Sequence, residues 1–551
     1  MKIALLSINI SYVHTNLALP LIRGFAESAI SAEWKEFAGT LKDDIQKDLK
    51  ALNDYAPDLL LTTLYMFNRG SLLALLKDFK KLRPDCIIIA GGPEFLGNNK
   101  KFLIENSFVN VVVRGEGEKP IKKLLKTFSV GINLPKTLSN ILGFCFLDRE
   151  SKYIDNSVAE IVKNIDKIPS VYMQKDFVFK KPFYQIETSR GCPGKCTFCT
   201  SSLSNKMRYH SFGYIISEIN KLKNCGVRNI RLLDRTFNYP AERAVQLLKI
   251  FRENFPEILF HLEIEPGLLT DELKIELSKA PLGHLHLEVG IQSLKPDTLK
   301  KIKRISSAEK VFAGINWLSQ QKNIVLHSDL IIGLPKTDIN SLCNDLRKLI
   351  LLSIDEIQIE RLKLLPGTSL REKAEEENIS FAETTPYEIL RTPQMPSKDL
   401  LLADTIMNFC DLFYNFAPLQ EVIGLIVREH NNFILSFAKY LHKRDIKGIS
   451  PDLRFQFLVD FLREKGIYSE RFFLQLLYSW VKAGYSPKKN SFGNARYKGK
   501  IPKKTKFIFG EKLSSKIQKR VYVTVFGGKN YYILLAHPNG HKPNVEILNF
   551  I

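Results

Sequence analysis

The sequence has 551 residues, of which 45% are hydrophobic and 25% charged, proportions that are ordinary for globular proteins. A chain of this length exceeds what one hydrophobic core supports, so we expect three or more domains. Eight cysteines without paired spacings argue against a disulfide framework, and no stretch approaches the ~20 apolar residues of a membrane span. The net charge of +22 indicates either a polyanionic partner such as nucleic acid or a lysine-rich solvated surface, and the scattered lysines favour the second.

Residues 1–130 alternate buried strands with amphipathic helices. Apolar runs typical of buried strands occupy residues 2–8, 58–63, 86–90 and 109–113, and the first run lacks the length and cleavage site of a signal peptide. Such strands separated by helices predict a parallel sheet covered on both faces, which binds ligands beyond the carboxyl ends of its strands. The residues there that we expect to contact a ligand are Tyr12, His14, Asn16, Gly91, Gly92, Pro93, Glu94, Arg114, Gly115, Glu116, Gly117 and Glu118.

Three of the eight cysteines, Cys192, Cys196 and Cys199, lie within eight residues in the spacing Cys-x-x-x-Cys-x-x-Cys. A structural zinc site needs four ligands, and an ordinary iron–sulfur cluster needs a fourth thiolate, but no further Cys or His is close by. Three thiolates on a 4Fe–4S cluster would leave one iron open for chemistry. The alternatives are a set of structural thiols and an incomplete zinc knuckle.

The segment 190–199 resembles the signature of radical S-adenosylmethionine (SAM) enzymes. The resemblance implies that the open iron binds SAM and that one electron cleaves it to methionine and a 5′-deoxyadenosyl radical. Phe198 occupies the place of the aromatic residue that contacts adenine in that family. The implied cofactors are a 4Fe–4S cluster and SAM, and the implied partner is an electron donor such as flavodoxin or ferredoxin. An oxygen-sensitive cluster also implies a reducing, cytoplasmic location.

Together with this motif, residues 1–130 resemble the flavodoxin-like (Rossmann-type) cobalamin-binding domains that are fused to radical SAM barrels. Cobalamin is therefore the implied third cofactor, held by the polar and glycine residues named above. The Asp-x-His-x-x-Gly motif of base-off cobalamin proteins is absent, so we interpret His14 as a polar loop residue rather than a cobalt ligand. The alternative is a flavodoxin-like fold that has lost its cofactor.

From residue 181 a strand followed by a helix recurs six times, which predicts a partial (β/α)6 TIM-type barrel. The strands are expected at residues 185–189, 229–233, 259–264, 284–290, 324–332 and 356–364. Functional residues of barrels gather at the C-terminal ends of the strands. The family resemblance assigns contacts with SAM to Asp234, Arg235, Glu263, Gln292, Ser293, Arg304, Gly333 and Pro366.

Several polar residues of this barrel have a second interpretation. Arg235, Glu263 and Arg304 could equally form salt bridges within the barrel. Four histidines on the strands are typical of packed core residues, although His261 or His327 could line the cavity, because alternation along a strand fixes one inward face. The four are His261, His284, His286 and His327.

After the barrel, residues 398–483 read as several amphipathic helices rich in Leu and Phe. This region is similar to the uncharacterised C-terminal domain of one branch of cobalamin-dependent radical SAM proteins. A basic run at residues 488–506 is typical of a flexible linker and, alternatively, of an RNA-binding segment. Residues 521–525 and 531–535 predict a terminal β-hairpin around two glycines.

The predicted organisation is a cobalamin-binding domain (1–130), a connector (131–180), a radical SAM barrel (181–375) and a mostly α-helical C-terminal region (376–551). The expected reaction is C-methylation, in which the radical removes a hydrogen atom and cobalamin delivers the methyl group. The alternatives are a cobalamin-dependent rearrangement or cyclisation, and an RNA-binding or RNA-modifying radical SAM protein. No membrane association is expected.

Overall fold

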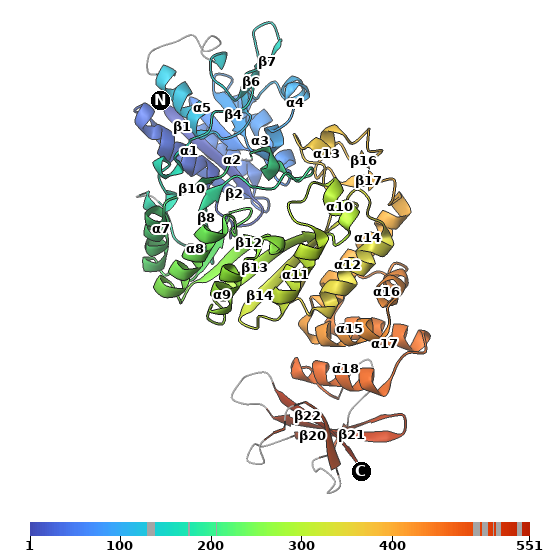
Figure 1. The fold of residues 1–551 in the computed structure, drawn as a ribbon. Coiled ribbons are helices and arrows are strands. Elements are labelled where there is room, and N and C mark those ends of the chain that lie inside the picture. The colour runs from blue at the N-terminus through green and yellow to red at the C-terminus, as the bar shows by residue number, and fades with distance from the viewer. Residues whose placement is uncertain are drawn as a thin grey trace.

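The computed structural model describes residues 1–551 apart from a small set of positions. In Figure 1 the N-terminal domain lies above the barrel, helices of the C-terminal region lie beside the barrel, and a small sheet lies at the far end of the molecule. The positions that are not described are 129–137, 175–176, 205, 489–495, 499–504, 511, 514–519, 537–542 and 551.

The N-terminal domain contains a seven-stranded sheet with the order β2-β1-β3-β4-β5-β6-β7. The first five strands are parallel, and their order is that of flavodoxin-like folds. Apolar side chains from the two faces of the sheet enter two separate hydrophobic clusters. The strands are β1 (Lys2–Asn9), β2 (Glu33–Thr40), β3 (Leu59–Thr63), β4 (Ile87–Gly91), β5 (Val111–Val113), β6 (Phe144–Leu147) and β7 (Tyr153–Asp155). The covering helices are α1 (Ala18–Ala26), α2 (Ile45–Tyr55), α3 (Arg69–Leu82), α4 (Lys100–Glu105) and α5 (Glu118–Phe128).

The predicted parallel sheet and its four strands are confirmed, whereas β2 and β7 are not predicted. For the segment that forms β6 the sequence predicts extended backbone but no place in the sheet. Strand β2 is an edge strand whose mostly exposed side chains give no continuous apolar run. Strands β6 and β7 lie in the segment predicted as a connector and extend the sheet with antiparallel pairings.

The barrel sheet has six parallel strands in the order β15-β14-β13-β12-β11-β8, which confirms the predicted partial barrel. Along β12 and β13 every second side chain is buried against the outer helices, and the alternate residues face the lumen. The strands are β8 (Tyr184–Ile186), β11 (Asn229–Leu232), β12 (Leu259–Ile264), β13 (Leu285–Gln292), β14 (Ile324–Ile332) and β15 (Glu356–Arg361). The main helices are α7 (Phe212–Asn224), α8 (Ala241–Asn254), α9 (Asp271–Ser278), α11 (Ala308–Ser319) and α12 (Ile339–Leu351).

The C-terminal helices pack on the open edge of this barrel and share its hydrophobic core. At the turn after the π-helix Cys410–Tyr414, the side chain of Asn415 bonds the edge strand β15. Its Oδ1 accepts a hydrogen bond from the Ile357 N–H at 3.0 Å, and its Nδ2 donates to the Ile357 carbonyl at 2.8 Å. The helices are α14 (Ser397–Phe409), α15 (Ala417–Glu429), α16 (Phe433–Leu441), α17 (Pro451–Glu464) and α18 (Glu470–Lys482).

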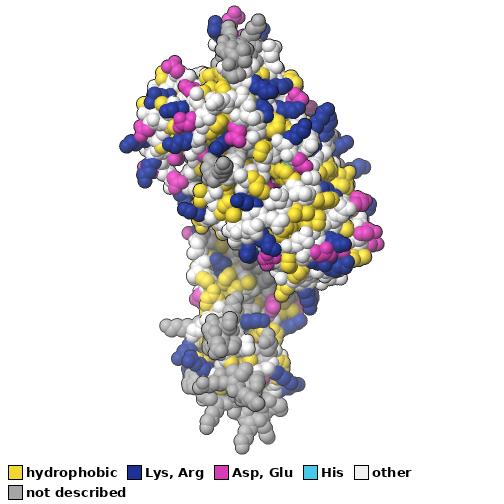
Figure 2. Space-filling model, turned by 90° about the vertical axis from the view of Figure 1, so that its left-hand side faces the viewer, with side chains coloured by type: hydrophobic (Ala, Val, Ile, Leu, Met, Phe, Trp, Pro, Cys, Tyr) yellow, Lys and Arg dark blue, Asp and Glu magenta, His cyan; other side chains and the backbone are white. Residues whose placement is uncertain are grey.

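The chain ends in a five-stranded antiparallel sheet, of which the predicted hairpin, β20–β21, is one part. The strands are β18 (Arg496–Tyr497), β19 (Thr505–Gly510), β20 (Arg520–Phe526), β21 (Lys529–Ala536) and β22 (Asn544–Phe550). Most of the basic run at residues 488–506 lies outside the described residues, so its predicted role stays a prediction. On the face shown in Figure 2, basic side chains are interspersed with acidic ones rather than gathered into one patch. Among the described residues, no helix combines the length and apolarity needed to cross a membrane.

Two helical glycines should respond in opposite ways to substitution by alanine. A Cβ at Gly314 in α11 would lie 2.1 Å from the carbonyl oxygen of Pro266, whereas a Cβ at Gly424 in α15 would meet nothing within 4 Å. We expect Gly314→Ala to destabilise the protein by about 1–3 kcal/mol through overpacking. We expect Gly424→Ala to stabilise it by about 0.5–1 kcal/mol, because alanine loses less backbone entropy. Thermal unfolding of the two variants measures this difference, and a destabilisation of equal size in both would contradict it.

Candidate active site

The cysteine loop is closed at its base by a two-stranded ribbon. Strand β9 (Ser189–Arg190) pairs with β10 (Arg208–Tyr209) in antiparallel register, so the loop leaves and re-enters the barrel at one point. Gly191 begins the loop with φ +98°, and a Cβ there would lie 2.7 Å from the carbonyl oxygen of Lys206. Only glycine fits this close approach, which brings the two ends of the loop together.

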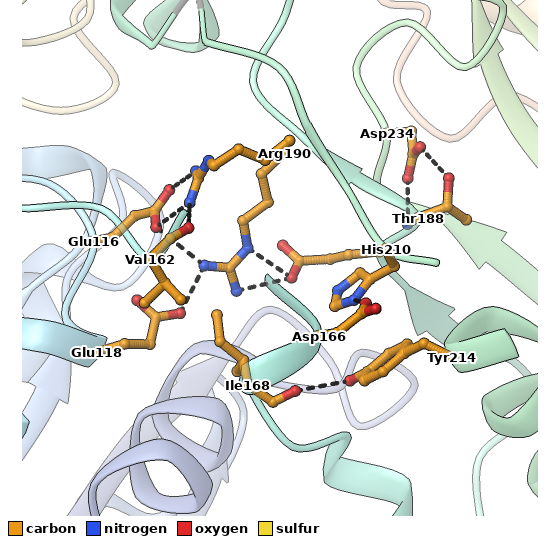
Figure 3. A network of polar contacts seen from close by, with 12 residues as sticks. Glu116, Glu118, Val162, Asp166, Ile168, Thr188, Arg190, His210, Tyr214 and Asp234 are labelled. Carbon is orange, nitrogen blue, oxygen red and sulfur yellow. Dashed lines mark hydrogen bonds and ion pairs between the residues drawn. The ribbon is translucent and has the colours of Figure 1, made fainter. Parts of the chain in front are cut away.

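Asp234 holds the strand that precedes the cysteine loop. Its carboxylate accepts hydrogen bonds from the Thr188 N–H at 2.7 Å, the Thr188 hydroxyl at 2.5 Å and the Ser189 hydroxyl at 2.7 Å (Figure 3). The side chain is buried, burial raises its pKa, and these hydrogen bonds oppose that rise. Asp234 therefore anchors residues 188 and 189 at the base of the cysteine loop, and its predicted contact with SAM stays a prediction.

The three thiols lie beside one cavity of ≈ 600 Å³ at the C-terminal mouth of the barrel, here called the cluster cavity. The Cys192 thiol lies 3.4 Å from the hydroxyl of Thr236, and Arg304 donates toward the Cys196 sulfur at 3.8 Å. Burial raises the pKa of the Cys196 thiol, and the Arg304 guanidinium opposes that rise by favouring the thiolate. Among the described residues, no three His, Cys, Asp or Glu side chains are grouped for a single metal ion. A cluster does not need such a group, because each thiolate binds a different iron.

Five predicted SAM contacts line the cluster cavity: Phe198, Arg235, Glu263, Gln292 and Arg304. Salt bridges join Arg235 to Glu263 at 3.3 Å and Arg304 to Glu265 at 2.6 Å, so the salt-bridge interpretation also holds for these side chains. Burial raises the pKa of Glu263 to about 6, although Arg235 acts in the opposite direction.

Three other predicted contacts lie outside this cavity. The Ser293 hydroxyl is buried and donates to Asp345 at 2.8 Å. Gly333 packs against the C-terminal region, since a Cβ there would lie 2.0 Å from the Ile389 Cδ1. Pro366 lies between the cavity and the N-terminal domain and is not among the lining residues. Ser293 and Gly333 have structural contacts at these positions, and the predicted contacts of the three residues with SAM stay predictions.

The part of the barrel lumen that lines the cluster cavity is polar, with Glu263, Glu288, Asp329 and Gln358 among its residues. Glu263 and Glu288 stand side by side on β12 and β13, and Asp329 lies opposite Gln358 on β15. Burial and the nearby carboxylates raise the pKa of Asp329 to about 8. His261 bonds Glu288 at 2.8 Å, and its ring lies 4.4 Å from that of His286.

A second cavity, here called the sheet-edge cavity, has a volume of ≈ 560 Å³ and lies between the carboxyl ends of the N-terminal strands and the cysteine loop. Its position is the one expected for ligands of an open parallel sheet. The predicted residues that line it are His14, Asn16, Gly91, Gly92, Gly115, Glu116, Gly117 and Glu118. Burial lowers the pKa of His14, which favours its neutral form.

Four predicted ligand contacts of the N-terminal domain do not line this cavity: Tyr12, Pro93, Glu94 and Arg114. Tyr12 is exposed to 68%. Glu94 is buried, pairs with Arg69 at 2.8 Å and accepts a hydrogen bond from the Tyr387 hydroxyl at 2.5 Å. Arg114 pairs with Asp155 at 2.7 Å. Glu94 and Arg114 therefore form ion pairs within the protein, and the predicted contacts of the four residues with cobalamin stay predictions.

The two cavities share Ser201 and Arg235 as lining residues. Sequence reasoning did not single out Tyr65, Glu187 or Arg190, which also line the sheet-edge cavity. Tyr65 comes shortly after an apolar strand and Glu187 lies within a predicted strand, and neither residue belongs to a motif. Arg190 is the first residue of the cysteine signature at 190–199, but the signature alone does not indicate which carboxylates Arg190 pairs with.

Comparisons with known proteins support the predicted fold. Residues 186–349 match the Radical SAM superfamily, and residues 375–511 match a protein family of unknown function. An uncharacterised methyltransferase of Pyrococcus horikoshii is 25% identical over 420 residues, which are 74% of this chain and 86% of that protein. Three further curated relatives are matched over about half of their own length, at 49%, 48% and 54%.

Two solved structures share the fold at low sequence identity. The radical SAM methyltransferase TsrM of Kitasatospora setae, whose structure contains cobalamin and a [4Fe-4S] cluster, is 18% identical, with a TM-score of 0.56. The match covers 70% of this chain and 76% of TsrM. The cobalamin-dependent radical SAM enzyme OxsB is 15% identical, with a TM-score of 0.62 and coverage of 86% and 78%.

The raised pKa of Asp329 predicts a pH-dependent stability. The folded protein holds a proton on this carboxyl up to about pH 8, whereas the unfolded chain releases it near the ordinary value of 3.8. Its stabilising contribution is therefore complete below the unfolded pKa and is lost as the pH rises toward 8. We expect the melting temperature to fall less between pH 6 and pH 8 in Asp329→Asn than in the parent protein. The exposed Asp271→Asn serves as control, and parallel curves for the parent and Asp329→Asn would contradict the prediction.

Proposed function

Because the chain is a radical SAM protein whose N-terminal domain has the cobalamin-binding type of fold, we propose that it methylates a carbon atom of its substrate. The observation that carries this proposal is the adjacency of the two cavities, one beside three thiols and the other beside glycine-rich strand ends, with Arg235 and Ser201 lining both. An enzyme that joins two cofactors in one reaction needs such adjacent sites.

The donor set of the cysteine loop fits a 4Fe–4S cluster. A Cβ at Gly194 would lie 3.4 Å from the Cys192 sulfur and 3.7 Å from the Cys196 sulfur, so both sulfurs lie around this glycine. Three thiols on one glycine-containing loop suit a cluster with one iron free for SAM. Arg304, beside Cys196, would offset part of the negative charge of the bound thiolates.

The sheet-edge cavity fits the proposed cobalamin. A Cβ at Gly91 would have only Val113 within 4 Å, at 3.8 Å, so a larger side chain would enter the cavity. Asn16 is fixed at the cavity wall, because its amide donates to the Thr63 hydroxyl at 3.1 Å and its carbonyl caps the Leu19 N–H at 3.2 Å. His14 and Asn16 would lie beside the corrin, with no cobalt ligand assigned to either.

When bound, the cluster and SAM supply a 5′-deoxyadenosyl radical, and cobalamin supplies a methyl group. Phe198 would contact the adenine of SAM, and Glu263 with Gln292 would accept or donate hydrogen bonds to its polar groups. Arg235, paired with Glu263, would hold that carboxylate in a fixed orientation at the boundary between the two cavities. A protein reductant such as flavodoxin or ferredoxin would supply the electron.

A rearrangement or cyclisation that uses cobalamin without methyl transfer is the second candidate, since the same two cavities would serve it. The products separate the two reactions. Methylation yields S-adenosylhomocysteine as well as 5′-deoxyadenosine, whereas a rearrangement yields no S-adenosylhomocysteine.

Single substitutions should remove each cofactor separately. After anaerobic reconstitution with SAM, cobalamin and a reductant, we expect Cys199→Ser to lose most of the iron and to keep the corrinoid. Gly91→Leu should lose the corrinoid and keep the iron, because its side chain would fill the sheet-edge cavity. Iron content, bound corrinoid and nucleoside products are the measurements.

The exposed Cys225 provides a matched control, and Cys225→Ser should retain both cofactors. A parent protein that binds no corrinoid under these conditions would contradict the proposed methyl transfer. Loss of both cofactors in Gly91→Leu without loss of folding would contradict the assignment of two separate sites.

A further inference from the structure

Arg190 connects the cysteine loop to the N-terminal domain. It lies two residues before Cys192, and its guanidinium bonds Glu118 at 2.7 Å, Glu116 at 3.3 Å and Glu187 at 2.9 Å (Figure 3). The Arg190 side chain is exposed to only 12% and that of Glu118 to 6%. Glu116 and Glu118 belong to the segment after β5 that lines the sheet-edge cavity.

Arg208 reinforces this connection from the other strand of the ribbon. Its guanidinium pairs with both carboxylate oxygens of Glu116 and donates to the Val162 carbonyl at 2.8 Å. Because Arg208 lies opposite Arg190 in the β9–β10 ribbon, both ends of the cysteine loop are bonded to one segment of the N-terminal domain. Two guanidiniums and three carboxylates share this partly buried site, so removal of one member leaves a charge without its partner.

The middle of the cysteine loop has an indirect link to the N-terminal domain, through the segment that contains Gly367 and Leu370. The Thr197 carbonyl accepts a hydrogen bond from the Leu370 N–H at 2.9 Å. Gly367, three residues earlier, packs so closely that a Cβ there would lie 2.6 Å from the Leu96 carbonyl oxygen. Leu96 belongs to the loop that follows β4, and Gly91 at the end of β4 and Gly92 at the start of this loop line the sheet-edge cavity.

We propose that Arg190 is a positioning residue, which couples the cysteine loop to segment 115–118 of the proposed corrinoid site and so fixes the two cofactors relative to each other. The inference rests on the proposed function for the identity of the cofactors, but the coupling itself is a property of the chain. Because guanidinium remains charged at all relevant pH values and binds carboxylates through a rigid fork, it suits such a fixed junction.

Hydrogen exchange of the full-length protein without added cofactors tests the coupling. We expect Arg190→Gln and Glu118→Gln each to raise amide exchange about tenfold in segments 191–204 and 115–118, with little change elsewhere in the barrel. The double variant should exchange no faster than Arg190→Gln, because both substitutions break the same interaction. Arg190→Lys, which keeps the charge but not the fork, should restore part of the protection.

The matched control is Lys123→Gln, which breaks a solvent-exposed pair with Glu160 at 3.1 Å in the same domain and should leave both segments unchanged. Unchanged exchange in segment 191–204 of both Arg190→Gln and Glu118→Gln would overturn the proposal. So would a uniform increase over the whole barrel, because that result indicates general destabilisation.

A second measurement links the coupling to the reaction. In the reconstituted protein, we expect Arg190→Gln to lower the ratio of methylated product to 5′-deoxyadenosine about tenfold. An unchanged ratio would overturn the functional part of the inference. If the parent protein binds no corrinoid, the proposed function fails, while the exchange experiment still decides whether Arg190 couples the two segments.

Discussion

The ion pairs of Glu116 and Glu118 with Arg190 and Arg208 are the interaction on which the arrangement of the two cavities depends. They join the glycine segment after β5 to the base of the cysteine loop. Together with the Glu94–Tyr387 hydrogen bond and the close approach of Gly367 to Leu96, this junction holds the sheet against the rest of the chain. Glu116 and Glu118 line the sheet-edge cavity and also hold the cysteine loop beside the cluster cavity. A change in the geometry of one cavity is therefore transmitted to the other.

The polar lumen is the second constraint on the site. Closed (β/α)8 barrels fill their interior with branched apolar side chains, whereas in this open six-stranded barrel Glu263, Glu288 and Asp329 face the same space. Burying several carboxylates together is unfavourable, and the protein offsets the cost with the Arg235 and His261 pairs and with a proton on Asp329. The barrel lumen therefore presents polar side chains to a ligand instead of a close-packed apolar core.

Local patterns predicted much of the fold and the cysteine loop, whereas the partners of polar side chains were not predictable. The six barrel strands and the thiol spacing are properties of short segments, so the amino-acid sequence alone was enough to predict them. Asp234 and Glu94 were assigned to cofactors because acids follow strands at binding edges. Their actual partners, Thr188 and Tyr387, lie 46 and 293 residues away in the chain, and only the tertiary structure selects them. Strand β2 was missed because a solvent-facing edge strand lacks an apolar run.

Asn415 imitates one residue of a neighbouring strand, because its side-chain amide bonds both the N–H and the carbonyl of Ile357. A six-stranded, unclosed barrel leaves such groups free to recruit a foreign strand. The helices that follow the barrel therefore act as its missing side, and they guard the enzyme against sheet-to-sheet polymerisation.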